Sequence, residues 1–134
     1  MLDCVFCQII KGEVPCYKIY EDKDFLGFLD IYPIAKGHCL LIPKVHYRWV
    51  YEVPNFGEYW KIAKKVSLIV KKIVKADSIN YLTIGEEIEH AHIWIIPRFK
   101  GDSDVIGIKR MKNKPNELEM QGLAKQINFQ SSQE

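Results

Sequence analysis

Three short strand-like segments follow one another closely near the start of the chain, and their spacing constrains the fold more than any other feature. Residues 16–21 alternate in polarity, and residues 25–29 and 38–42 are rich in apolar side chains. The connections between them are too short for the crossover of roughly a dozen residues that a parallel pair needs. Pro33 and Gly37 supply turn signals in the second connection. The sequence therefore predicts a mostly antiparallel sheet.

One long amphipathic helix is expected after these strands. Asn55 and Glu58 have the spacing of a capping box that starts a helix. Apolar residues then keep helical spacing as far as about Ala76; they are Tyr59, Ile62, Ala63, Val66, Val70, Ile73 and Val74. Such a helix can cover one face of the sheet.

The remaining elements are expected to be short. Residues 79–84 and 88–96 are strands by composition and alternation. Asp3 can cap a helix that runs to Lys11, and Pro115 opens a weak last helix. This order of helices and strands predicts an α+β fold.

Length and composition set broad limits on the class of protein. A chain of 134 residues, 48% of them hydrophobic, is expected to form one domain, which we place at residues 1–128, with a frayed tail at 129–134. That composition excludes disorder as the main state. A net charge of +2 gives no argument for a nucleic-acid partner. No apolar run approaches the roughly 18 residues of a membrane span, so we expect no membrane association.

The cysteines point to a reducing compartment. The first residues lack a basic region followed by an apolar stretch, so we expect no secretion signal and a cytoplasmic protein. Cys4 and Cys7 form a close pair, for which metal ligands, a redox pair and two incidental thiols are the alternatives. No thioredoxin-like strand precedes the pair, which weakens the redox alternative. Cys16 and Cys39 lie in strand patterns and are expected to be buried apolar residues.

The stretch 89–98 carries the most informative chemistry. In a strand, His90, His92 and Trp94 project from one face. Two imidazoles on one face can serve as metal ligands, or as a nucleophile with a helper. A half-exposed strand that merely contains two histidines explains the bare spacing equally well.

Three ordered segments give the chain a family resemblance. They are residues 4–15, with Cys-x2-Cys, residues 30–46, which end in Pro-Lys-x-His, and residues 89–98. Together they resemble the histidine triad (HIT) family, in its Hint-like, zinc-containing bacterial and archaeal type. The resemblance implies a HIT-like fold with a five-stranded antiparallel sheet, one long helix and short terminal helices. It also implies a homodimer, for which Tyr59, Trp60 and Tyr81 are candidates for exposed apolar surface.

The resemblance further implies an activity and a set of site residues. The activity is hydrolysis or transfer at the α-phosphate of a purine nucleotide, with nucleoside phosphoramidates or dinucleotide polyphosphates as substrates. His92 is the nucleophile that forms a covalent nucleotidyl-histidine. A structural zinc ion is held by Cys4, Cys7, His46 and His90. The substrate-binding candidates are Asp30 for the ribose, Phe6, Ile9, Phe28 and Ile31 for the base, and Gly85 and Trp94.

Taken without the resemblance, several of these candidates have simpler interpretations. The four apolar residues of the base pocket are core residues by pattern. Asp30 is equally a turn residue after a strand. Six lysines on the polar face of the long helix are explained as a solvated surface; they are Lys61, Lys64, Lys65, Lys71, Lys72 and Lys75.

Two departures from the family pattern bear on activity. Trp94 stands where the family has its third histidine, and an indole donates one hydrogen bond but cannot carry a proton back and forth; it can stack on a base or fill the pocket. Gly85 is followed by Glu86 and Glu87 in place of Gln and Ser. These carboxylates point away from the phosphate, hold a divalent cation, or mark the loss of the phosphate site. The simplest interpretation is two solvated glutamates in a tight turn, which still removes the usual phosphate contacts. The alternative to an enzyme is therefore a catalytically weak nucleotide-binding or interaction module.

Overall fold

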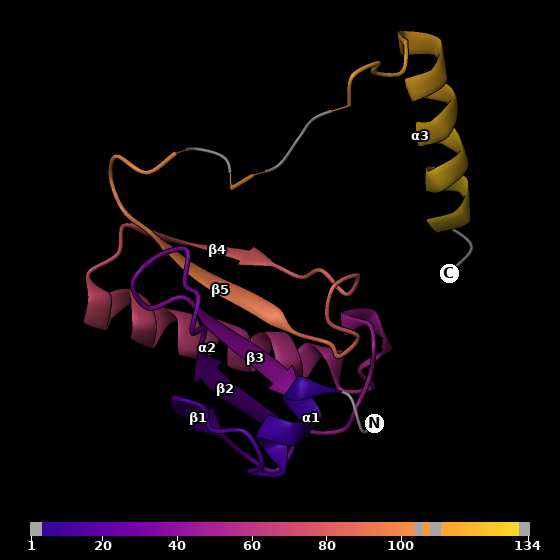
Figure 1. Cartoon of the computed structure of the whole chain (residues 1–134). Coiled ribbons are helices and arrows are strands. Elements are labelled where there is room, and N and C mark those ends of the chain that lie inside the picture. The colour runs from indigo at the N-terminus through magenta and orange to yellow at the C-terminus, as the bar shows by residue number, and fades with distance from the viewer. Residues whose placement is uncertain (1–3, 104–105, 108–110, 132–134) are drawn as a thin grey trace. The chain divides into compact units, whose positions relative to one another are not determined.

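The computed structural model describes residues 4–103, 106–107 and 111–131, and the chain divides into two units, Met1–Asp102 and Ser103–Glu134, which are treated separately. In the first unit, five strands form one sheet in the order β1-β2-β3-β5-β4, and all neighbours are antiparallel (Figure 1). The strands are β1 (Lys18–Glu21), β2 (Phe25–Leu29), β3 (Cys39–Pro43), β4 (Ser78–Leu82) and β5 (Ile93–Arg98). The predicted α+β fold with a five-stranded antiparallel sheet is confirmed.

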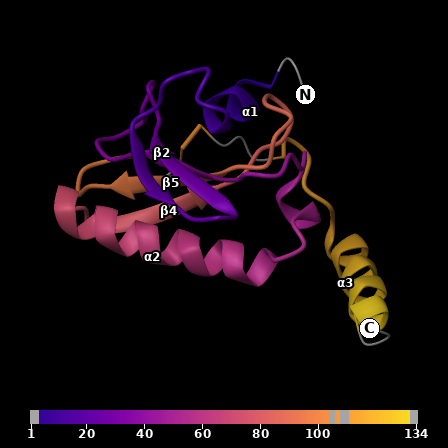
Figure 2. The same ribbon diagram turned by 90° about the horizontal axis from the view of Figure 1, so that it is seen from below.

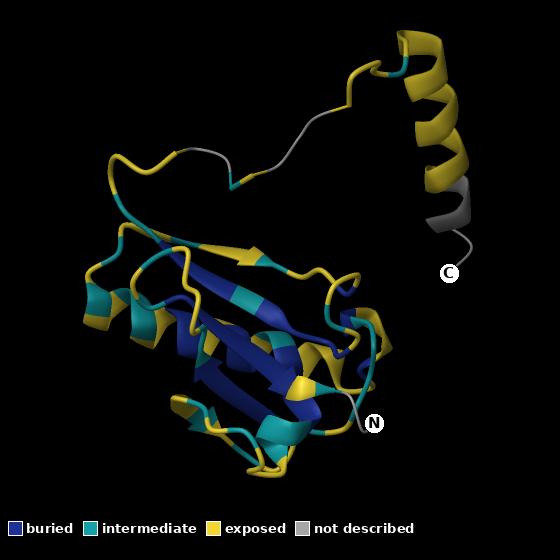
Figure 3. Ribbon diagram, in the orientation of Figure 1, coloured by how far each residue is buried: buried dark blue, intermediate teal, exposed yellow. Residues whose placement is uncertain are grey.

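A helix covers each face of this sheet. Figure 2 shows α2 (Phe56–Val74) on one side of the sheet and the short α1 (Val5–Ile10) on the other. Successive strand residues point to opposite faces, so Leu41 belongs to the hydrophobic cluster beneath α2, whereas Leu40 belongs to the cluster around Phe6 in α1. The dark blue strands β2, β3 and β5 in Figure 3 mark this buried centre.

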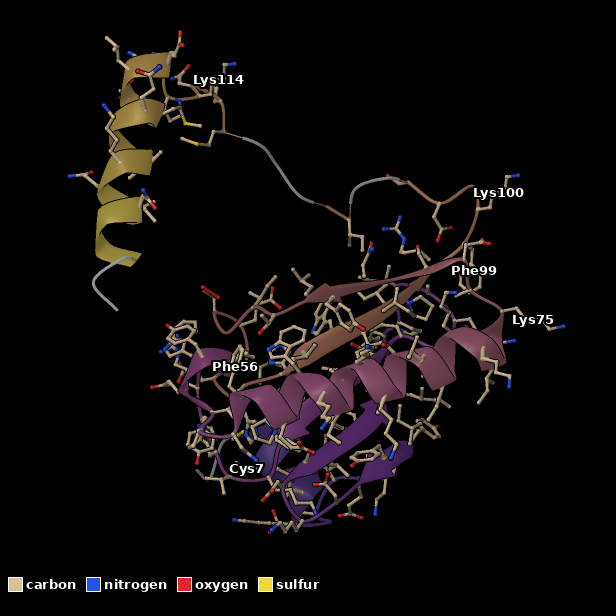
Figure 4. The ribbon with its side chains drawn as sticks, turned by 180° about the vertical axis from the view of Figure 1, so that it is seen from behind. Cys7, Phe56, Lys75, Phe99, Lys100 and Lys114 are labelled. Carbon is tan, nitrogen blue, oxygen red and sulfur yellow. The ribbon has the colours of Figure 1, made fainter. Side chains whose placement is uncertain are left out.

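The long helix forms as its apolar spacing predicts. Figure 4 labels Phe56, its first residue, and Lys75, which follows its last turn. Lys75 adopts a left-handed conformation (φ 59°), and its N–H donates to the carbonyl of Lys71, which closes the helix. The expected capping box is wrong, because the side chain of Asn55 makes no cap bond. Its amide instead lies 3.5 Å from the Asp24 carboxylate.

Several element bounds differ from the predicted ones. The strand expected at 79–84 is β4 and ends at Leu82, and the strand expected at 88–96 is β5 and begins only at Ile93. Pairing in the second of these strands begins at Ile93, which pairs with Leu41 of β3. The Ala91 N–H before it donates to the carbonyl of Tyr47 in the loop after β3 (2.6 Å). β1 begins at Lys18, and β3 ends one residue later than predicted, at Pro43.

The first helix is capped by a cysteine. Cys4 is the N-cap of α1, and its Sγ accepts a hydrogen bond from the N–H of Cys7 (3.3 Å). Asp3, the expected cap, lies outside the described residues. The start of α1 therefore carries both sulfur atoms of the Cys-x2-Cys pair.

Tyr59 was expected on an exposed apolar surface, and this expectation is wrong. Its side chain is fully buried, stacks on Phe25 with ring centroids 4.9 Å apart, and donates its hydroxyl to the carbonyl of Leu41 (2.6 Å). It lies on the inner face of α2, where its hydroxyl has a buried partner. Trp60 is partly buried, and Tyr81 is 42% exposed.

The second unit contains one helix, α3 (Glu117–Ser131). A reciprocal pair of hydrogen bonds between Asn116 and Glu119 starts it. Its bounds extend into the segment that we expected to be a frayed tail, and residues 132–134 lie outside the described ones. Across the described part of the chain, no helix combines the length and apolar character needed to cross a membrane.

Candidate functional site

Two segments that are distant in sequence lie side by side next to the first residue of β5. The pairing of β3 with β5 aligns Leu41 with Ile93, and the backbone bond from Ala91 to Tyr47 continues this alignment outside the sheet. His90 and His92 are therefore not in a regular strand, but both imidazoles contact Phe6, with ring centroids 5.8 and 5.3 Å apart. Trp94 packs against the same hydrophobic cluster, so the three side chains share one side of the sheet as predicted.

Cys4, Cys7, His46 and His90 form one cluster of potential metal ligands. Their ligand atoms all lie within 4.8 Å of one another. The Sγ of Cys7 is 3.2 Å from Nδ1 of His46, and the Sγ of Cys4 is 3.3 Å from Nδ1 of His90. The two Nδ1 atoms are 3.1 Å apart. A tetrahedral zinc ion would separate such ligands by roughly 3.3–3.8 Å, so this cluster can hold a metal ion.

The surroundings of His90 prepare it as a ligand. Its Nε2 lies 2.8 Å from the carbonyl of Pro43, which can only accept, so Nε2 carries the proton and Nδ1 presents its lone pair to the cluster. Burial lowers the pKa of His90 to about 4, which keeps the imidazole neutral. Burial also raises the pKa of Cys7, and the hydrogen bond with Cys4 adds to this effect. A bound cation would oppose this rise in the pKa, because a thiol that coordinates a metal is deprotonated.

His92 has the opposite tautomer. Its Nδ1 lies 2.8 Å from the carbonyl of His90 and donates to it, so Nε2 has a lone pair free for attack. Burial lowers the pKa of His92, and the hydrogen bond to His90 opposes the shift. At neutral pH the ring is therefore uncharged and can act as a nucleophile.

A cavity of about 270 Å³ opens beside His92. Its walls come from residues 83–92 and from residues 48–51, which lead into the short 3-10 helix η1 (Val50–Glu52). The lining residues are Arg48, Trp49, Val50, Tyr51, Thr83, Gly85, Glu86, Ala91 and His92. Arg48, Trp49 and Tyr51 were not among the predicted site residues, because a short loop and a three-residue 3-10 helix carry no periodic signal. Their position just after His46 was the one indication in the sequence.

Gly85 lines this cavity, and the indole ring of Trp49 lies against its backbone. A Cβ atom at this position would be 2.6 Å from Cε3 of Trp49, so any other residue would displace the ring. Trp49 also stacks on Tyr51, with centroids 5.9 Å apart and planes inclined by 11°. Glu86 lines the cavity and is exposed, and Glu87 is exposed but is not a lining residue.

Asp30 is occupied by local contacts. Its Oδ1 accepts a hydrogen bond from the N–H of Tyr32 (2.8 Å), which is the turn role that sequence reasoning had left open. Its other oxygen lies 3.6 Å from Nε2 of the buried His38. His38 in turn accepts the N–H of Ile34 (3.0 Å) and holds this turn in place.

The other candidate substrate residues lie outside the lining of the cavity. Phe6 and Phe28 are buried and make an edge-to-face contact, with centroids 5.7 Å apart. Ile9 is half-buried beside them, and Ile31 is 66% exposed. Trp94 is half-buried and its ring centroid is 5.0 Å from that of His38. Of the predicted substrate residues, the structure places Gly85 with His92 in one cavity and Phe6 against the His92 ring.

Comparison with known proteins gives a consistent family match. The model of the family described as HIT domain matches residues 11–101. The uncharacterized HIT-like protein MJ0866 of Methanocaldococcus jannaschii is 40% identical over 117 residues, which cover 82% of this chain and 90% of that protein. A solved structure, SMU.412c from Streptococcus mutans UA159, is similar with a TM-score of 0.82 and 36% identity, and the match covers 97% of this chain and 86% of that one.

Two further relatives have names that state an activity. Adenylylsulfatase HINT3 of Arabidopsis thaliana is 47% identical over 108 residues, which cover 75% of this chain but only 54% of that protein. Adenosine 5'-monophosphoramidase HNT1 of Saccharomyces cerevisiae is 36% identical over 108 residues, covering 77% of this chain and 67% of that protein.

The Cys/His cluster generates a prediction about metal content. We expect protein purified without added metal to carry about one metal ion per chain, and a chelator to lower its unfolding temperature, because a structural metal contributes folding free energy. Cys7→Ser should lose the metal, whereas Cys16→Ser, outside the cluster, should retain it. Elemental analysis and thermal unfolding measure both effects. Metal content below about half an equivalent, with no chelator effect, would contradict the assignment.

Proposed function

The chain belongs to the HIT domain family, and from that premise we propose that it is a nucleotide hydrolase or nucleotidyltransferase. The substrates proposed are purine nucleoside phosphoramidates or dinucleotide polyphosphates, cleaved at the α-phosphate. The observation that carries the proposal is His92: its Nδ1 donates to a carbonyl and its ring lines the cavity. Relatives named as an adenosine 5'-monophosphoramidase and an adenylylsulfatase support this class of reaction.

The proposed reaction has two displacement steps at phosphorus. Nε2 of His92 attacks the α-phosphorus, a P–N bond forms, and the bond to the leaving group breaks with its electron pair going to that group. The hydrogen bond from Nδ1 to the His90 carbonyl stabilises the positive charge that the ring acquires. A water molecule, or another acceptor, then attacks the phosphorus and releases His92.

Trp94 limits the rate in this scheme. The leaving group needs a proton, and an indole cannot supply one and take it back. The second candidate function, a catalytically weak nucleotide-binding module, is favoured by this position and by the carboxylate of Glu86 in the cavity wall.

We further propose that the metal of the Cys/His cluster is zinc. Two cysteines and two histidines form a closed set of four ligands with no open position, which is typical of structural rather than catalytic zinc. The ion would join the start of α1, the loop at His46 and the segment at His90. Its contribution to the reaction is positional, since His90 also accepts the hydrogen bond of His92.

The protein is also proposed to be a cytoplasmic homodimer. β4 is an edge strand, whose open backbone groups a partner can cover. Two aromatic side chains in edge-to-face contact, Tyr81 of β4 and the partly buried Trp60 of α2, add apolar surface beside this edge. All four cysteines are free, which suits a reducing compartment.

The nucleophile is tested by His92→Ala. We expect hydrolysis of an adenosine phosphoramidate to fall by more than about 10³-fold, because removal of a nucleophile removes the covalent route. Metal content and unfolding temperature, measured on the same samples, serve as controls for folding. Equal rates for the wild type and this variant would favour the binding module.

Restoring a histidine at position 94 tests the proposed rate limit. Trp94→His should raise the rate, since a group that moves a proton in the transition state typically contributes about 10²–10⁴-fold. This gain in rate is expected to be smaller than the full factor, because the smaller histidine leaves a cavity where the indole had packed. Trp94→Phe is the matched control, because it keeps an aromatic ring and adds no titratable group. A gain in both variants would attribute the effect to space rather than to proton transfer.

The oligomeric state is tested by light scattering at low micromolar concentration. We expect a particle of twice the 15.7 kDa chain mass. Tyr81→Glu on β4 should shift it toward monomer, because a charge would enter the covered apolar surface. Lys61→Glu, on the polar face of α2, should leave the dimer intact. A wild-type particle of 15.7 kDa would refute the dimer.

A further inference from the structure

Arg48 occupies a position in the cavity that the proposed mechanism has not used. It lines the same 270 Å³ space as His92. Among the described residues that line this cavity, Arg48 supplies the one cationic side chain and Glu86 the one carboxylate. The volume is below the roughly 300–1,000 Å³ typical of drug-sized ligands. The space therefore suits a phosphoryl group better than a whole nucleotide.

The guanidinium of Arg48 is held in place by its neighbours. Its central carbon lies 4.5 Å from the ring centroid of Trp49, which is a cation–π contact. Trp49 is itself fixed between the backbone of Gly85 and the ring of Tyr51. An aromatic surface of this kind orients the plane of the guanidinium before any ligand binds.

This guanidinium retains an unused hydrogen-bond donor. Its Nη1 lies 3.3 Å from Oε1 of Glu89, an exposed partner. Its Nε is buried and has no hydrogen-bond partner within the described part of the chain. A buried donor without an acceptor is costly, and this cost favours a shift of the side chain that brings the N–H to an acceptor on a ligand in the adjoining cavity. Arg binds carboxylate and phosphate oxygens through two parallel N–H groups.

We propose that Arg48 binds the reacting phosphoryl group of the substrate at His92, and so supplies the positive charge that offsets Glu86. This inference rests on the proposed function, because the phosphoryl group enters the cavity only if His92 is its nucleophile. Arg48 then contacts oxygens whose charge shifts during the displacement, and it stabilises them in the transition state as well as in the bound substrate.

The experiment compares AMP with adenosine, which lacks the phosphate. Calorimetric titration at one fixed salt concentration gives both affinities for the wild type, Arg48→Gln, Arg48→Lys and Glu89→Gln. We expect Arg48→Gln to weaken AMP binding by about tenfold to a hundredfold, the size of lost charge-assisted hydrogen bonds, with adenosine unchanged. The AMP affinity of Arg48→Lys should lie between those of the wild type and Arg48→Gln, because lysine keeps the charge but not the paired donors.

Glu89→Gln is the control that separates this role from a structural one. It removes the carboxylate partner of Arg48 without altering a residue of the cavity lining. We expect it to leave AMP affinity unchanged or higher. The proposal would be overturned if Glu89→Gln and Arg48→Gln lost AMP affinity equally, or if Arg48→Gln lost affinity for AMP and adenosine equally. It would also be overturned if Arg48→Gln lost no AMP affinity.

Turnover distinguishes failure of this inference from failure of the proposed function. If wild-type hydrolysis of an adenosine phosphoramidate depends on His92 while Arg48→Gln keeps its kcat/KM, the enzyme stands and the role of Arg48 is overturned. We expect kcat/KM of Arg48→Gln to fall at least as far as its AMP affinity, because the contact persists in the transition state.

Discussion

The antiparallel pairing of β3 with β5 is the interaction on which the rest of the site depends. It aligns Leu41 with Ile93, residues that are separated in sequence by the whole of α2. Beyond the paired residues, the loop after β3 and the segment before β5 stay together through the bond from Ala91 to Tyr47. This loop carries His46 and Arg48, and the opposing segment carries His90 and His92. The metal cluster combines these two pieces of chain with the two cysteines at the start of α1, and the cavity combines them with residues 83–86.

His90 connects the two parts of the site. Its Nε2 donates to the carbonyl of Pro43, and its Nδ1 faces the cysteines and His46. Its own carbonyl accepts a hydrogen bond from Nδ1 of His92. The same residue therefore belongs to the metal cluster and determines which nitrogen of His92 is free. A metal ion at this cluster would fix the position of His92, the proposed nucleophile, without itself contacting the proposed substrate.

The surroundings of His92, the proposed nucleophile, show how this chain differs from the histidine triad pattern. Glu86 and Trp94 replace groups that the resemblance assigns to phosphate binding and proton transfer. Arg48 and Trp49 come from the opposite wall and bring a cation and an aromatic surface. The charge balance of the cavity is therefore set by two loops together, and neither loop reveals it alone.

The sequence by itself determined the elements whose signal is local. Apolar content located β2 at 25–29 as the structure has it, and helical spacing located α2 to within about two residues of its observed end at Val74. The motifs Cys-x2-Cys, Pro-Lys-x-His and His-x-His, read through the family resemblance, grouped the four potential metal ligands that the structure brings within 4.8 Å.

Only the tertiary structure decided where these patterns stop and what they face. β5 begins at Ile93, which pairs with Leu41 of β3, and the Ala91 N–H before it donates to a carbonyl of the loop after β3. Tyr59 is buried because Phe25 and the carbonyl of Leu41 lie beneath α2. Arg48 lines the cavity because Gly85 leaves room for Trp49. Each outcome depends on a partner far away in the sequence, and neither propensity nor periodicity within a segment contains that information.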